Sequence, residues 1–145
     1  MLVAPLTLLL PNLGLGEVLL ESLIECSEIE RVIAALPRGY ISVKVISGHT
    51  YYYRQWREGE KIISSYVPES YLKAVKQKIE IRKQNEELLK ILKKDAKKAE
   101  REVLKAGEVS QERIDAAKAK IASLSEEDLL DRKAVVDALK NELLA

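Results

Sequence analysis

Apolar residues between positions 15 and 36 recur every three to five positions, which is the spacing of one face of a helix. Pro37 follows directly and stops any helix that reaches it. Further along, residues 69–106 run for 38 positions without Gly or Pro and are rich in Lys, Glu, Leu and Ala. The pattern therefore predicts an N-terminal helix over 15–36 and one long helix over 69–106, which Gly107 ends.

Between these helices the period changes to alternation. Residues 38–68 are rich in β-branched and aromatic side chains and are interrupted at Ser47-Gly48 and Glu58-Gly59. Both dipeptides supply the positive φ values that tight hairpin turns need. The segment predicts a three-stranded antiparallel meander with strands at about 40–46, 49–57 and 61–67.

If both turns are two-residue loops, strict alternation divides the side chains of the sheet between two faces. The face predicted to be the core carries Ile41, Val43, Val45, Tyr52, Trp56, Ile63 and Val67. The other face, which we call the outer sheet face, carries Tyr40, Lys44, His49, Tyr51, Tyr53, Arg57 and Tyr66. All seven aromatic residues of the chain fall within positions 40–71, so any distinctive surface is expected there.

The apolar stripe of the long helix changes side along its length. Leu72, Val75 and Ile79 follow one line, and a second group lies about 130° around the cylinder at 100° per residue. That second group is Ile81, Leu88, Leu92, Ala96, Ala99 and Val103. The first turns of the helix are therefore expected on the apolar face of the sheet and the remainder against other helices.

Two capping signals indicate those other helices. Ser110 precedes a helical pattern that reaches Leu124, and Ser125 with Asp128 resembles a capping box before a pattern that reaches Leu143. The expected fold is α+β and mainly helical, with an N-terminal helix, a three-stranded meander, a long helix and a C-terminal antiparallel helical hairpin. The corresponding segments are 1–37, 38–80 and 81–145.

The net charge of the chain is small, but the charged residues are distributed unevenly along the sequence. The chain has 24 Lys and Arg against 23 Asp and Glu, a net charge of +1. Residues 1–37 carry five Glu and one Arg, residues 38–106 carry 17 basic and 9 acidic side chains, and residues 108–145 carry 6 basic and 9 acidic ones. A basic middle is typical of a polyanion partner, or its charge is neutralised by packing of the acidic ends.

The segment RGYISVKVISGHTYYYRQWREGEKIISSYVP, followed by a long Lys/Glu-rich helix, resembles a small uncharacterised prokaryotic domain. The shared pattern is Tyr-Tyr-Tyr-x-Gln-Trp/Tyr-Arg-Glu-Gly and then a Lys-x-x-Ser-x-Tyr strand. In architecture it is also similar to the three-stranded DNA-binding modules at the N-termini of phage integrases. That second resemblance implies a sheet placed in the major groove of DNA.

Few residues of the chain are suited to catalysis. The chain has one His, one Cys and no Phe, and His49 with no nearby Cys or carboxylate pair supports neither a catalytic triad nor a zinc site. Cys26 lies among apolar residues on the first helix and is expected to be a small buried hydrophobe. The acidic cluster at 126–131 is expected to interact favourably with the dipole at the N-terminal end of a helix. We therefore expect no enzyme activity, no metal and no other cofactor.

The apolar residues 1–11 are too short to span a membrane and are interrupted by Pro5 and Pro11. No Lys or Arg precedes Arg31, so the basic start of a secretory signal is missing. We expect no membrane association and a cytoplasmic location.

The favoured hypothesis is non-catalytic binding of nucleic acid, with DNA as the preferred kind, because Lys and Arg can bind phosphates while Tyr rings stack on bases. The candidate binding residues are Lys44, His49, Tyr51, Tyr53, Arg54, Arg57, Tyr66, Lys73 and Lys76. If residues 15–36 fold back over the outer sheet face, the tyrosines become core and this surface disappears. The alternative function is a protein-interaction or assembly module, in which the long helix and the C-terminal hairpin bind a protein partner or a second copy of the chain.

Overall fold

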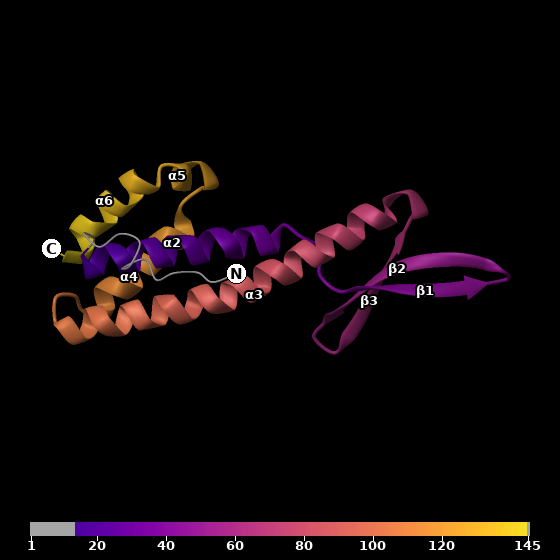
Figure 1. Cartoon of the computed structure of the whole chain (residues 1–145), viewed down its shortest axis with the longest axis horizontal. Helices are drawn as coiled ribbons and strands as arrows, with labels where there is room; N and C mark the ends of the chain where they lie inside the picture. The colour runs from indigo at the N-terminus through magenta and orange to yellow at the C-terminus, as the bar shows by residue number, and fades with distance from the viewer. Residues whose placement is uncertain (1–13, 145) are drawn as a thin grey trace. The chain divides into compact units, whose positions relative to one another are not determined.

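A computed structural model describes residues 14–144, so the apolar segment with Pro5 and Pro11 lies outside the described residues (Figure 1). Its elements in chain order are α2 (Leu15–Ala34), β1 (Tyr40–Ile46), β2 (His49–Glu58), β3 (Lys61–Val67), α3 (Glu69–Ala106), α4 (Gln111–Ser123), α5 (Glu126–Leu130) and α6 (Arg132–Leu144). The expected α+β, mainly helical fold is confirmed, with its N-terminal helix, meander, long helix and C-terminal helices.

The described residues form two compact units. Residues 31–87 make up the first, which we call the sheet unit. Residues 14–30 together with 88–144 make up the second, the helical unit. The grouping differs from the segments expected at 1–37, 38–80 and 81–145 in that most of α2 joins the C-terminal helices.

The core of the helical unit is built from residues of α2, α3, α4, α5 and α6. Its most deeply buried side chains are Leu19, Leu20 and Ile24 of α2, Val103 of α3, Ile114 of α4, and Leu139 and Leu143 of α6. Each fully buried aliphatic side chain contributes about 1.5–3 kcal/mol of transfer free energy. The apolar side of α2 is therefore used inside the helical unit, where it closes the expected C-terminal hairpin into a bundle.

Ion pairs explain where the acidic charge of α2 goes. Arg132 of α6 donates to Glu28 at 2.7 Å and to Glu21 at 3.4 Å, and Lys140 of α6 donates to Glu17. These carboxylates are thus paired with bases of α6, inside the helical unit. Charges 104 to 123 positions apart give no local signal, so the sequence alone indicated only pairing of the acidic ends with the basic middle.

Both predicted capping signals are present in the C-terminal part. The hydroxyl of Ser110 accepts from the backbone N–H of Arg113, and Ser125 forms a capping box with Asp128. The helix expected to run on from Ser125 is instead divided into α5 and α6. The division occurs at Asp131, which caps α5 and accepts a hydrogen bond from the backbone N–H of Ala134, so its carboxylate starts a second helix.

The sheet has the order β1-β2-β3, and both of its turns are two-residue loops. Ser47 and Gly48 have φ of 50° and 78° in the first turn, which is the left-handed conformation that hairpin turns need. The second turn is Gly59-Glu60 and not Glu58-Gly59, because Glu58 still pairs with Lys61. The cross-strand register confirms the predicted division of the strand residues listed above between two faces.

The predicted core face of the sheet is only partly a core. Val67 of β3 and Ile79 of α3 are buried in the sheet unit, whereas Val43 and Val45 of β1 are 57% and 68% exposed. A helix about 10–12 Å wide covers only part of strands that are about 23–34 Å long. The first turns of α3 were expected to lie against this face. Val75 of α3 does line a groove together with Val67 of β3. Ile81, expected in the second stripe of the long helix, is 45% exposed.

Candidate nucleic-acid interface

The pairing register brings the central residues of the outer sheet face together. Lys44 lies opposite Tyr51, and Tyr53 lies between Ser42 on β1 and Tyr66 on β3. Side chains two positions apart on a strand point to the same face. The local sequence thus places three tyrosines and one lysine on adjacent positions of three strands.

These side chains contact one another. The ring centroids of Tyr53 and Tyr66 are 5.8 Å apart in an edge-to-face arrangement, and those of Tyr51 and Tyr66 are 6.5 Å apart. The ammonium of Lys44 lies 4.8 Å from the centroid of the Tyr53 ring, within the range of a cation–π interaction. We call Lys44, Tyr51, Tyr53 and Tyr66 the tyrosine cluster. Tyr66 is 55% exposed, so the cluster is accessible on its β3 side.

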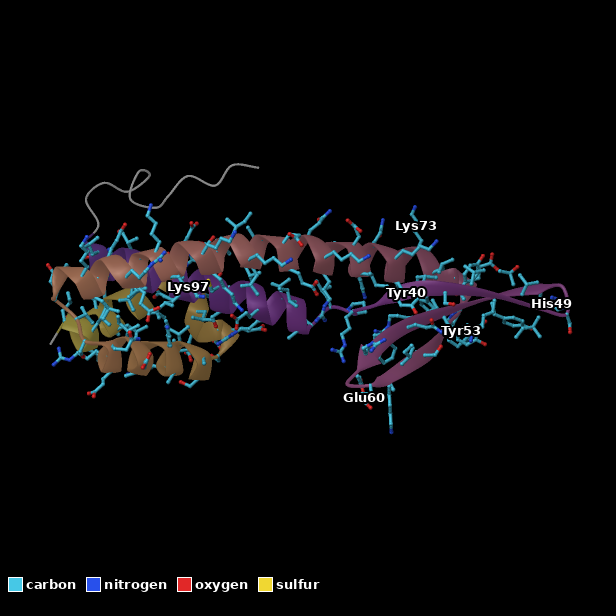
Figure 2. All side chains as sticks on the ribbon, turned by 90° about the horizontal axis from the view of Figure 1, so that it is seen from below. Tyr40, His49, Tyr53, Glu60, Lys73 and Lys97 are labelled. Carbon is cyan, nitrogen blue, oxygen red and sulfur yellow. The ribbon has the colours of Figure 1, made fainter. Side chains whose placement is uncertain are left out.

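His49 and Arg57 extend the outer sheet face toward its two ends. They stand eight residues apart on β2, which corresponds to about 27 Å along an extended strand. Figure 2 shows His49 at the tip of the β1–β2 hairpin and Tyr53 further back along the strand. Within the three strands, all of which the structure describes, the one carboxylate is Glu58, and it lies on the opposite face.

Arg54 was expected beside the tyrosines, and the structure corrects this. It pairs with Ile41 and Ser65, so its side chain points to the opposite face. There its guanidinium carbon lies 3.8 Å from the ring centroid of Trp56, and it donates a hydrogen bond of 2.8 Å to the carbonyl of Arg38. The reason is alternation: Arg54 occupies an even position of β2, whereas the tyrosine cluster uses odd positions of that strand.

Two other guanidinium groups lie close enough to Arg54 to affect its pKa. Burial lowers the pKa of Arg54, and the nearby guanidinium groups of Arg38 and Arg82 lower it further. Arg82 donates to the carbonyls of Ile33 at 2.9 Å and Leu36 at 2.6 Å. Arg82 therefore binds the carbonyl groups at the carboxyl-terminal end of α2.

Lys73 and Lys76 are exposed near the start of α3. Figure 2 shows Lys73 on the side of α3 that points away from the strands, and Lys76 follows about 60° further around the helix. The structure does not bring Lys73 together with the tyrosine cluster. Closeness along the chain suggested that they belong together, but it does not specify on which side of the helix a residue lies.

Other residues of the outer sheet face were missed. Gln55 shares the face with Tyr53 because both occupy odd positions of β2, and two exposed isoleucines, Ile46 and Ile62, also lie there. Strand alternation alone would have found all three. The face is consequently a mixed surface in which amide and aliphatic groups border the tyrosine cluster.

The alternative in which α2 buries the tyrosines depends on a free apolar side of that helix. Leu19, Leu20 and Ile24 of α2 are instead fully buried in the core of the helical unit. The ring contacts described for Tyr51 and Tyr53 come from the sheet itself. The tyrosines thus stabilise one another as cross-strand neighbours and still leave part of the face accessible.

Cys26 is a buried apolar group, as predicted. It packs with Leu92 and Ala96 in a second cluster of the helical unit. Burial, and then the nearby carboxylates of Glu30 and Glu25, raise the pKa of the thiol to about 11. The thiol is therefore protonated at neutral pH and a poor nucleophile.

Over residues 14–144, no group of three or more His, Cys, Asp and Glu side chains is arranged to hold a metal ion. Glu126, Glu127 and Asp128 occupy the first turn of α5, where Asp128 completes the capping box. In the same range, no helix has the length and apolar composition needed to cross a membrane.

The sheet unit combines an antiparallel three-stranded meander, flanked in sequence by two helices, with an aromatic and basic outer face. A family described as "Domain of unknown function (DUF6788)" matches residues 19–77, which span most of α2, the whole meander and the start of α3. The resemblance to an uncharacterised domain is therefore confirmed. No curated protein and no solved structure matches the chain, so the likeness to integrase modules and the prokaryotic origin stay predictions.

Proposed function

We propose that this protein binds nucleic acid without catalysis, with DNA as the preferred kind, through the outer sheet face. The observation that supports the proposal most is the composition of that face. Lys44, His49 and Arg57 lie on it with the tyrosines, while the single strand carboxylate, Glu58, lies on the other side.

Each part of this surface suits one part of a nucleic acid. Phosphates are attracted by Lys and Arg in a salt-dependent way, and unstacked bases gain about 1–3 kcal/mol each from an aromatic ring. The sheet unit as a whole carries 11 basic and 6 acidic side chains, a net charge of +5. A polyanion would therefore be attracted toward the unit before it contacts the face.

The test is a fluorescence-anisotropy titration of the full chain with labelled single-stranded and duplex DNA at several salt concentrations. We expect K44E and R57E to weaken binding and to reduce the slope of log K against log salt by about 0.7–0.9 for each phosphate that is no longer neutralised. Y53A should weaken binding to single strands by about tenfold, because it removes one stacking surface and the ring that supports Lys44.

The matched control is K133E, which reverses an exposed charge in the first turn of α6, where an acidic side chain also suits the helix dipole. Its affinity should equal that of the wild type. If K44E and R57E also bind like the wild type, or if the wild type binds neither single-stranded nor duplex DNA, the proposal fails.

The assembly alternative has weaker support. The buried apolar side chains of α2, α3, α4, α5 and α6 fill cores within the helical unit. Leu130 of α5 is 85% exposed, and Ile91 of α3 and Leu144 of α6 are 46% and 42% exposed. Scattered exposed apolar residues of this kind are ordinary for a protein surface. We therefore retain nucleic-acid binding as the one proposed function.

A further inference from the structure

β1 is an open edge of the sheet. Among residues 14–144, the strand order places β2 on one side of β1 and no strand on the other. Its seven residues, YISVKVI, contain no proline, and Val43 and Val45 are more than half exposed. An exposed apolar edge strand without proline is a template for pairing with another strand.

The turn geometry tells which backbone groups face outward. Ile46 and His49 close a two-residue turn, in which the first carbonyl accepts from the last N–H, so they form a hydrogen-bonded pair. Hydrogen-bonded and non-hydrogen-bonded pairs alternate along an antiparallel ladder. The N–H and C=O groups of Ile41, Val43 and Val45 therefore point to the open edge. Among the described residues, these three make no backbone hydrogen bond to another element.

The side-chain pattern of β1 reads the same in both directions around Val43. Moving outward from Val43, the pattern is polar at Ser42 and Lys44, apolar at Ile41 and Val45, and apolar again at both ends. An antiparallel pair of identical strands places each residue opposite its mirror position. The central residue, Val43, has its N–H and C=O groups directed to the open edge. A two-fold axis through a hydrogen-bonded pair requires such a residue at its centre, because the two copies of that residue bond to each other.

We infer that β1 pairs antiparallel with β1 of a second copy of this chain, with a two-fold axis at Val43. Val43 then faces Val43 of the other copy, and Ile41 faces Val45, so the apolar row continues across the junction. Lys44 faces Ser42, so the two lysines are not opposed. Six backbone hydrogen bonds close the edge, and two three-stranded sheets become one of six strands. The inference does not rest on nucleic-acid binding.

The other edge strand lacks this match. β3 reads KIISSYV, and self-pairing around its central Ser64 would place Lys61 opposite Val67 and Ile63 opposite Ser65. Charged and polar residues would then face apolar ones on the same side. β3 therefore serves as the matched control for β1.

A cysteine scan in a C26A background tests the register. V43C should form a disulfide-linked dimer under mild oxidation, because paired Cα atoms in a hydrogen-bonded pair are about 5.5 Å apart, within disulfide reach. V45C should remain monomeric on a non-reducing gel, since its counterpart lies about 13 Å along the paired strand. Cross-linking of V45C as readily as V43C would overturn the inferred register.

Sedimentation equilibrium tests the association itself, over about 10 µM to 1 mM because one strand pair buries less area than a standard interface. The wild type should approach twice its monomer mass. V43K should raise the dissociation constant about a hundredfold by opposing two like charges, while I62K, changed at a β3 position that is 59% exposed, should leave it unchanged. Far-UV circular dichroism confirms that each variant is folded. A wild type that stays monomeric, or a dimer that persists in V43K, would overturn the inference.

Discussion

Replacement of Gly39 by alanine should destabilise the sheet more than replacement of Gly48 or Gly59, the glycines of its two turns. Gly39 precedes β1 with φ of 105°, a conformation that residues with a Cβ rarely adopt. A Cβ at this position would lie 2.0 Å from the backbone oxygen of Gln55 and 3.0 Å from the Cβ of Trp56. Both neighbours belong to the central strand, so neither can move without disturbing the ladder.

The magnitude follows from two costs. A positive φ costs an L-residue about 1–2 kcal/mol, and forcing an extra carbon into a packed site costs about 1–3 kcal/mol. We expect G39A to lower the free energy of unfolding of the sheet unit by about 3 kcal/mol. Gly48 provides a matched control, because its φ is 78° and nothing lies within 4 Å of a Cβ there. By the first of these costs alone, G48A should lower it by only about 1 kcal/mol.

The assay is urea unfolding followed by the fluorescence of Trp56, which is the one tryptophan of the chain and lies on β2. Because this probe reports the sheet, helix unfolding measured by circular dichroism can be followed separately. The urea concentration at the unfolding midpoint should be highest for the wild type, lower for G48A and lowest for G39A. Equal decreases for the two variants would contradict this explanation, since the close approach to Gln55 would then add nothing.

Two further predictions concern ion and hydrogen-bond partners. R82M should lower the free energy of unfolding by about 2 kcal/mol, because the carbonyls of Ile33 and Leu36 at the end of α2 lose a charged donor. K83M on the same helix is the control, and an R82M variant as stable as K83M in urea would contradict the capping role. Burial raises the pKa of Glu100, but hydrogen bonds from Gln111 and Lys118 outweigh it and hold that pKa below its usual value of 4.5. A depressed folded-state pKa adds stability above pH 4.5 that is lost as the pH falls through the folded-state pKa. E100Q should therefore cost about 1 kcal/mol at pH 7 and progressively less as the pH is lowered, measured by thermal unfolding. A cost that does not change with pH would exclude a contribution from the charge.

The fold was accessible from local signals. Proline and glycine at positions 37, 68 and 107 fixed the helix ends within about two residues, and strict alternation with two turn dipeptides fixed both faces of the sheet. What local patterns could not supply were the long-range partners. Nothing near Glu17 or Glu28 in sequence indicates that α6 neutralises them.

The candidate site was predicted only where strand register determines it. Lys44 and the tyrosines are neighbours because of alternation, whereas Arg54, Lys73 and Lys76 were grouped with them by proximity along the chain. Arg54 lies on the opposite face, since a shift of one position on a strand reverses the direction of a side chain.

Nuclear magnetic resonance of the full ¹⁵N-labelled chain, titrated with single-stranded DNA, tests the proposed function most directly. We predict that amide shifts concentrate at Lys44, Tyr51, Tyr53 and Tyr66 and decline as salt is raised. Shifts confined to Trp56 and the opposite face, shifts confined to the helical unit, or a spectrum that DNA leaves unchanged would contradict binding through the outer sheet face.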